Sequence, residues 1–159
     1  MTRLDVQIEE ADGEEVAEIL ALQKLAYTSE AELIDDYTIP PLHQTLEEIQ
    51  AEFAEQVFLK VEHENEIVGS VRGYVQDGTC YIGKLIVHPQ AQNQGLGTRL
   101  LKAIEGHFSE AQRYELFTGW KSVKNLYLYE KLGYERFKEV KVSDKLTLVY
   151  LQKLNKKDR

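Results

Sequence analysis

The sequence contains little cysteine and no pattern of metal ligands. Its 159 residues include a single cysteine, Cys80, so no disulfide can form within the chain. Neither Cys80 nor any of the four histidines lies at metal-ligand spacing from another such residue. We therefore expect no metal site and a reducing compartment, most simply the cytoplasm.

Long apolar runs are also missing. No stretch approaches the roughly 20 apolar residues that cross a membrane, and residues 1–10 lack the apolar core of a secretion signal. We expect a protein with no membrane partner and no targeting segment. The composition, 43% hydrophobic and 29% charged with three prolines, is that of an ordinary globular protein.

Basic residues are scarce relative to acidic ones. The chain has 19 Lys and Arg against 27 Asp and Glu, for a net charge of −8 at pH 7. Binding to nucleic acid depends on clustered Lys and Arg that neutralise phosphates. The one basic cluster is the run KLNKKDR at residues 153–159, which is typical of a solvated chain end. We expect no nucleic-acid partner.

The hydrophobic periodicity predicts one domain, residues 1–159, of the α/β class (α+β mixed sheet). No repeat or linker interrupts it. Two-residue alternation predicts strands, a 3.6-residue period predicts helices, and Glu64-Asn65 and Asp77-Gly78 are typical of tight hairpin turns. The expected order is strand 3–8, helix 13–26, helix 45–55, strands 57–63, 66–76 and 79–88, helix 95–107, strand 113–119, helix 122–132, and strands 134–142 and 146–154. Residues 27–44 are expected to be irregular. This order predicts a mixed central sheet of about seven strands flanked by helices.

The stretch VHPQAQNQGLGTRLL places two glycines where a helix begins. A helix start leaves about four backbone N–H groups unpaired and carries a partial positive charge, so it binds anions without lysine. Gly95 and Gly97 would let a phosphate approach those groups closely. Tight turning or close helix packing is the alternative use of these glycines. A dinucleotide-binding fingerprint is excluded because it needs a third glycine at position 100, which is Leu100. A Walker A phosphate-binding loop is excluded because Trp120 interrupts its one candidate sequence, GWKS.

Two motifs resemble the GCN5-related N-acetyltransferase (GNAT) superfamily. The run Leu85-Ile86-Val87-His88-Pro89 followed by Gln92-Asn93-Gln94-Gly95-Leu96-Gly97 is similar to its motif A, in which an apolar strand precedes Gln/Arg-x-x-Gly-x-Gly/Ala. About 30 residues later, Asn125-Leu126-Tyr127-Leu128-Tyr129-Glu130-Lys131-Leu132-Gly133-Tyr134 resembles motif B. The predicted element order also matches the family, so the resemblance covers nearly the whole chain.

The resemblance implies an N-acetyltransferase that moves the acetyl group of acetyl-CoA directly to a primary amine of a small molecule or peptide, in a ternary complex. It implies that strands 79–88 and 113–119 separate at a bulge to admit the pantetheine arm. Tyr129 would be the catalytic acid that protonates the leaving thiolate, and it shares a helix face with Asn125. The residues implied in cofactor binding are Leu85, Ile86, Val87, Gln92, Asn93, Gln94, Gly95, Leu96, Gly97, Thr98 and Asn125.

The sequence departs from the family pattern at the position expected for the general base. Many relatives carry a glutamate on the strand before motif A, whereas TCYIGKLIV has Lys84 there and no carboxylate. The remaining candidates are Glu32, Asp35, Asp36, His43, Tyr37, Tyr74 and Tyr81, and for each a surface or packing role is the alternative. We name no base. The acidic residues of segment 27–44 favour a cationic acceptor, but Arg72 adds a positive charge. Arg72 would either bind a carboxylate of the acceptor or neutralise Asp35 or Asp36.

Two other functions remain open. The missing carboxylate is compatible with a non-catalytic acyl-CoA-binding or regulatory module on the same fold, and a structural protein of unrelated fold would have no affinity for CoA. Phe117 and Trp120 are expected to pack in the core rather than line a cleft. A homodimer is common for this fold, and one sequence does not decide whether this chain forms one.

Overall fold

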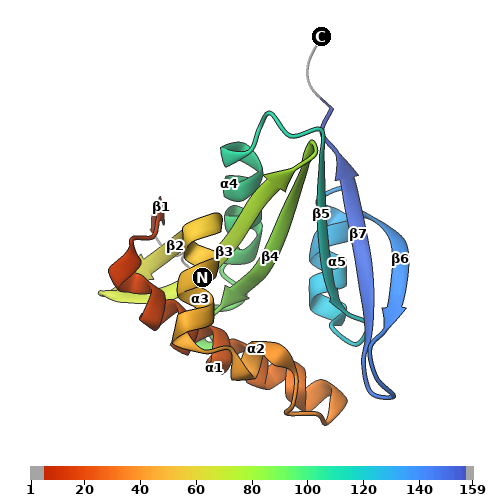
Figure 1. Ribbon diagram of the computed structural model, residues 1–159, viewed down its shortest axis with the longest axis horizontal. Helices are drawn as coiled ribbons and strands as arrows, with labels where there is room; N and C mark the ends of the chain where they lie inside the picture. Colours follow the sequence, from red (N-terminus) through yellow and green to blue (C-terminus); the bar gives the residue numbers. More distant parts are fainter. Residues whose placement is uncertain (1–5, 157–159) are drawn as a thin grey trace.

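The computed structural model describes residues 6–156, which form a seven-stranded sheet with helices on both faces (Figure 1). In chain order the elements are β1 Ile8–Glu10, the short 3-10 helix η1 Gly13–Glu15, α1 Val16–Ile34, α2 Pro40–His43, α3 Leu46–Glu55, β2 Val57–His63, β3 Glu66–Gln76, β4 Thr79–Val87, the short 3-10 helix η2 Pro89–Ala91, α4 Leu96–His107, β5 Arg113–Gly119, α5 Val123–Lys131, β6 Glu135–Lys141 and β7 Thr147–Leu154. The predicted mixed sheet and the order of its elements are confirmed.

The sheet runs in the order β1-β2-β3-β4-β5-β7-β6, and β4–β5 is its parallel pair. Both predicted hairpin turns form. Glu64 and Asn65 have φ of 53° and 66°, and Asp77 and Gly78 have φ of 51° and 83°. Two consecutive residues with positive φ, in the left-handed conformation, make the two-residue hairpin turn whose twist matches that of the flanking strands.

The parallel pair β4–β5 is short, and the two strands separate after it. Only Thr79, Cys80 and Tyr81 of β4 pair with β5. On its other side, β4 pairs with β3 along most of its length, with a register shift between Ser70 and Arg72. Opposite that shift Lys84 has φ of 46°, so β4 carries an extra residue there. Figure 1 shows the two strands starting side by side and diverging toward α1.

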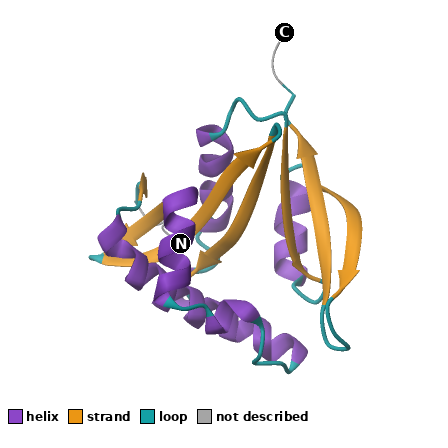
Figure 2. Cartoon of the chain, in the orientation of Figure 1, coloured by secondary structure: helices purple, strands orange, loops and turns teal. Residues whose placement is uncertain are grey.

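The helices form two layers around the sheet (Figure 2). On one face, α4 and α5 bury Leu100, Ile104, Leu126 and Tyr129 in the largest apolar cluster of the described residues. On the other face, α1 and α3 cover β2, β3 and β4, and their core includes Ile19, Ile49 and Phe58. The opening between β4 and β5 therefore lies between the two helical layers.

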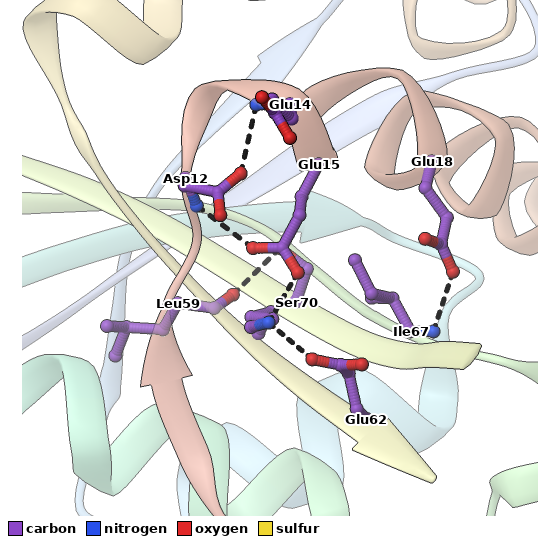
Figure 3. Close-up of polar contacts among 9 residues, drawn as sticks. Asp12, Glu14, Glu15, Glu18, Leu59, Glu62, Ile67 and Ser70 are labelled. Atoms are coloured by element: carbon purple, nitrogen blue, oxygen red, sulfur yellow. Dashed lines mark hydrogen bonds and ion pairs between the residues drawn. The ribbon is translucent and has the colours of Figure 1, made fainter. Parts of the chain in front are cut away.

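Polar contacts fix the start of α1 to the sheet (Figure 3). Asp12 and Glu15 form a reciprocal capping box at η1. Glu15 also forms an ion pair with Lys60 on β2, and Lys60 forms a second ion pair with Glu62. One turn later, a Glu18 carboxylate oxygen accepts a hydrogen bond from the backbone N–H of Ile67 at 2.8 Å. These contacts set the direction in which α1 leaves the sheet.

Two sequence predictions for this region are wrong in part. Residues 27–44 were expected to be irregular, but α1 continues to Ile34 and α2 spans Pro40–His43. The third apolar cluster explains the extension, because Ala31 and Ile34 pack there against Ile39 and Leu146. Residues 3–5 of the strand expected at 3–8 lie outside the described residues, Val6 and Gln7 are not in a strand, and the observed β1 spans Ile8–Glu10.

Candidate functional site

A cleft of about 1390 Å³ lies where β4 and β5 separate. Its walls come from both helical layers: the second half of α1, the start of α4, the inner face of α5, and the facing edges of β4 and β5. The cleft therefore passes through the sheet instead of lying on one face. Most of the side chains that the sequence analysis singled out meet there.

The exposed edge of β4 forms one wall. Leu85, Ile86 and Val87 line the cleft. Ile86 and Val87 pair with Ser70 and Gly69 of β3, while the pairing of β4 with β5 has already ended at Tyr81. This edge of β4 therefore offers backbone donors and acceptors to an extended ligand, in the manner of an added strand.

The start of α4 forms the second wall. Gly95 caps the helix with φ of 79°, a conformation that glycine adopts without steric cost. The N-cap makes no side-chain hydrogen bond to the helix, and helix geometry leaves its first N–H groups without intrahelical acceptors. A Cβ at Gly97 would lie 3.3 Å from Leu128 Cδ2 on α5, so glycine keeps the two helices close together. Gln92, Asn93, Gly95, Leu96, Gly97 and Thr98 line the cleft, whereas Gln94 does not.

α5 supplies the two motif-B side chains. Tyr129 is 4% exposed and lines the cleft, and Asn125 one turn earlier donates a hydrogen bond to Thr118 Oγ1 at 3.2 Å. Burial raises the pKa of the Tyr129 hydroxyl well above its usual value, and the nearby Tyr27 and Glu30 act in the same direction. Tyr129 is therefore protonated throughout the physiological range.

α1 brings Tyr27 and Glu30 to the same cleft. Burial and the Glu30 carboxylate raise the pKa of Tyr27 to about 12, although Arg72 acts in the opposite direction. A Glu30 oxygen accepts a hydrogen bond from the Ser122 hydroxyl, which joins α1 to the start of α5 across the opening. Glu30 forms no ion pair within residues 6–156.

Arg72 belongs to a closed ring of hydrogen bonds whose other members are Gln23, Gln44 and Glu52. Its guanidinium donates to Glu52 Oε1 at 2.5 Å and to Gln23 Oε1 at 2.7 Å. Gln44 completes the ring, since it accepts from Gln23 at 2.9 Å and donates to Glu52 Oε2 at 3.0 Å. Burial lowers the pKa of Arg72, and Glu52 opposes this effect. The prediction that Arg72 neutralises Asp35 or Asp36 is wrong, because its acidic partner is Glu52.

The candidate bases divide into two groups. Tyr74 and Tyr81 line the cleft and stack with ring centroids 5.3 Å apart. The others do not line it: Glu32, Asp35, Asp36, Tyr37 and His43. Asp36 instead accepts hydrogen bonds from the backbone N–H and hydroxyl of Thr38, because the chain turns there after α1. His43 Nε2 lies 2.8 Å from the Tyr37 carbonyl oxygen.

Sequence reasoning missed three carboxylates of the cleft, Glu30, Glu52 and Glu115. Glu30 and Glu52 lie on helices with many exposed glutamates, so no local pattern distinguished them. The core positions expected for Phe117 and Trp120 are wrong, since both are about half exposed, and Phe117 lines the cleft at the edge of β5.

No group of three or more His, Cys, Asp or Glu side chains within residues 6–156 is arranged to hold a metal ion. Over the same range, no helix combines the length and apolar character needed to span a bilayer.

The chain is similar to a family of known acetyltransferases. Residues 17–134 match the Acetyltransferase (GNAT) family. A curated relative, UPF0157 protein YqkA of Bacillus subtilis (strain 168), is 29% identical over 131 residues. The match covers 82% of this chain and 38% of that protein, so this chain spans well under half of its relative's length.

Solved structures share the fold. PaiA N-acetyltransferase from Thermoplasma acidophilum, in complex with coenzyme A, matches with a TM-score of 0.79 at 12% identity, covering 95% of this chain and 99% of that one. The ribosomal-protein-S18-alanine N-acetyltransferase of Escherichia coli matches with a TM-score of 0.75 at 13% identity, covering 97% and 96%. The family match over residues 17–134, together with the separated parallel strands and the glycine-capped α4 beside them, shows that this chain belongs to the GNAT family of acetyltransferases.

Proposed function

We propose that this protein transfers the acetyl group of acetyl-CoA to a primary amine. The observation that carries the proposal is the meeting of three features in one cleft: the edge of β4 that does not pair with β5, the start of α4 whose glycine N-cap gives no side-chain hydrogen bond, and the buried hydroxyl of Tyr129. The solved relative that contains coenzyme A supports the choice of a CoA thioester.

The cleft residues fit such a substrate. The backbone of Leu85, Ile86 and Val87 would hydrogen-bond the pantetheine arm in place of β5. The N–H groups from Gln92 to Thr98 would hold the diphosphate, which is favoured by the partial positive charge of the helix start. Asn125 would contact the cofactor from the neighbouring helix. Acetyl-CoA supplies the activated acyl group.

Tyr129 is the proposed acid of the reaction. The amine nitrogen forms a bond to the thioester carbonyl carbon, the C–S bond breaks, and the Tyr129 hydroxyl gives its proton to the departing sulfur. A β4 backbone N–H would stabilise the negative charge that develops on the carbonyl oxygen. A raised phenol pKa keeps the donor protonated, and a thiol of pKa about 8.5 is a tolerable leaving group.

The burial of Cys80 favours direct transfer of the acetyl group without an acyl-enzyme intermediate. Its side chain is fully buried, does not line the cleft, and has a pKa raised to about 12 by burial and by Glu105. A thiol in that state is a poor nucleophile. The amine therefore attacks the thioester itself in a ternary complex.

Glu30 is the proposed acceptor of the amine's proton. An alkylamine of pKa about 10.4 is almost entirely protonated at neutral pH, at a cost of about 4 kcal/mol for the reactive form. Glu30 lines the cleft near Tyr129 and has no cationic partner among the described residues. It would take this proton directly or through water.

The alternative is a non-catalytic acyl-CoA-binding module. It is favoured by the lack of a carboxylate on β4, where many relatives carry a glutamate as the base and this chain has Lys84. Replacing Tyr129 with Phe separates the two functions. We expect kcat to fall by about 10² or more, in line with the loss of a general acid, while the affinity for acetyl-CoA stays within about twofold. Turnover would be followed by release of free CoA thiol. Equal turnover of the Phe variant would remove the role of the hydroxyl, and no turnover of any amine by the native protein would favour the binding module.

A further inference from the structure

The acceptor side of the cleft carries an unbalanced positive charge. Lys84 lines both the main cleft and a smaller adjoining pocket between α2, α3 and β4. Within residues 6–156, its ammonium group has no ion pair or hydrogen bond. Burial lowers the pKa of Lys84 and the nearby Arg72 acts in the same direction, whereas the Glu52 carboxylate opposes them. A cation held in a partly dry site without a partner favours an anionic ligand.

Arg72 reinforces the charge of Lys84. It is 2% exposed, and its Nε is the one buried side-chain nitrogen or oxygen without a hydrogen-bond partner among the described residues. Glu52 does not balance both cations, because its oxygens already accept from Arg72 and Gln44. In the main cleft, Lys84 and Arg72 thus face one committed carboxylate, Glu52. A second carboxylate, Glu48, lines only the smaller pocket, where its Oε1 accepts a hydrogen bond from the Thr45 backbone N–H.

The bulge in β4 explains why Lys84 reaches this position. Its φ of 46° is the left-handed conformation that takes the strand out of register. The preceding residue, Gly83, also lines the cleft and has open space where a Cβ would be, so the strand leaves room in the cleft next to the bulge. Tyr74 and Tyr81 line the same cleft, and their stacked rings form an aromatic wall.

Glu30 provides the opposite charge. It lines the same cleft from α1, near Tyr129, and has no cationic partner in the described part of the chain. Near the proposed reaction centre the cleft thus presents a carboxylate with no cationic partner, and by the bulge it presents an ammonium group with no ion pair. The other lysines that line the cleft lie at or just before α5: Lys121, Lys124 and Lys131. Together, Glu30 and Lys84 complement a molecule that carries both an amine and an acid group.

We propose that the acceptor is a small amine that also carries a carboxylate, that Lys84 binds this carboxylate, and that the aromatic wall of Tyr74 and Tyr81 contacts the rest of the molecule. The inference rests on the proposed function, since it names the substrate class of the same site. It assigns to Lys84 a role in specificity and none in the chemical step.

The test uses matched pairs of acceptors. Phenylalanine, tyrosine, tryptophan and methionine are compared with the amines that result from their decarboxylation, under saturating acetyl-CoA. For the native protein we expect kcat/KM to be at least about tenfold higher for the carboxylate-bearing member of one or more pairs. Lys84→Met should remove this preference by raising KM, Lys84→Arg should restore most of it, and Lys102→Met, an exposed lysine of α4 outside the cleft, should leave it unchanged.

A second measurement does not depend on turnover. Binding of the same compounds to the CoA-saturated protein is followed by calorimetry, and Lys84→Met is expected to weaken binding of the carboxylates by about tenfold while the Kd for acetyl-CoA stays constant. Three results overturn the inference: decarboxylated amines that bind or react as well as the amino acids, no binding of either, or a loss in Lys84→Met confined to acetyl-CoA. Failure of the proposed function looks different, because then acetyl-CoA is consumed with no amine at all, whether or not it binds.

Discussion

At the scale of single residues, burial decides which groups of the cleft can act. Tyr129 and Cys80 are both buried, but Tyr129 reaches the cleft and Cys80 does not. The i, i+4 spacing of Asn125 and Tyr129 was enough to place both on one helix face, and the structure puts that face on the cleft. Glu30 was beyond sequence reasoning, because its place in the cleft depends on how α1 packs against distant segments such as Ser122, which is 92 residues away and donates a hydrogen bond to it.

The raised pKa of Tyr129 makes a prediction about the pH dependence of turnover. Because burial raises that pKa above the usual value of 10.0, the acid form persists as the pH rises, while the acceptor amine becomes neutral. We expect kcat at a saturating concentration of acceptor to increase from pH 7 toward about pH 10, with no descending alkaline limb. A pH–rate profile with a saturating thioester measures this. A descending limb centred near pH 9, matched by no change in protein stability, would contradict the assignment.

At the scale of elements, α1 connects the two halves of the site. It is tied to β3 through Glu18 and Ile67, and to the start of α5 through Glu30 and Ser122. The sequence predicted a helix that begins at residue 13, but placed its end at residue 26. The Tyr-Thr-Ser run 27–29 has weak helix propensity, and the packing of Ala31 and Ile34 against Ile39 outweighs it.

The link between η1 and β2 should respond to acid. Burial alone would raise the pKa of Glu15, but hydrogen bonds from Lys60 and from the Asp12 backbone outweigh that effect and lower it below 4.5. A carboxyl whose pKa is depressed on folding stabilises the protein above its unfolded pKa, and this contribution is lost as the pH falls through the folded pKa. Urea unfolding of the native protein and of Glu15→Gln should therefore differ more at pH 7 than at pH 3.5. A difference that is constant or grows with acid would show that the ion pair has no such role.

At the scale of the whole molecule, the cleft exists because the sheet separates in its middle. Hairpin turns and hydrophobic periods predicted strands β2 to β7 almost residue by residue, since these signals are local, whereas the first strand was misplaced. The three-residue contact between β4 and β5 is not local, and only the family resemblance indicated it in advance. The sites of Arg72 and Lys84 could not be predicted for the same reason, because their neighbours come from α1, α2 and α3.

Binding across this opening should stabilise the fold. Acetyl-CoA at about 100 times its dissociation constant adds about 2.7 kcal/mol, which for a chain of this size is a rise in Tm of about 5–10 °C. Thermal denaturation with and without acetyl-CoA measures the shift. Gly97→Val, whose side chain would crowd Leu128 beside the helix start, should lose at least about half of it. Lys102→Met serves as the control and should keep the full shift.

The central claim is that bare backbone N–H groups at residues 92–98, and not cationic side chains, hold the diphosphate of a CoA thioester. A crystal structure of this protein with acetyl-CoA tests it most directly. The account predicts diphosphate oxygens within hydrogen-bond distance of these N–H groups, with the pantetheine arm along Leu85, Ile86 and Val87. A diphosphate held by lysine or arginine side chains elsewhere on the molecule would contradict it.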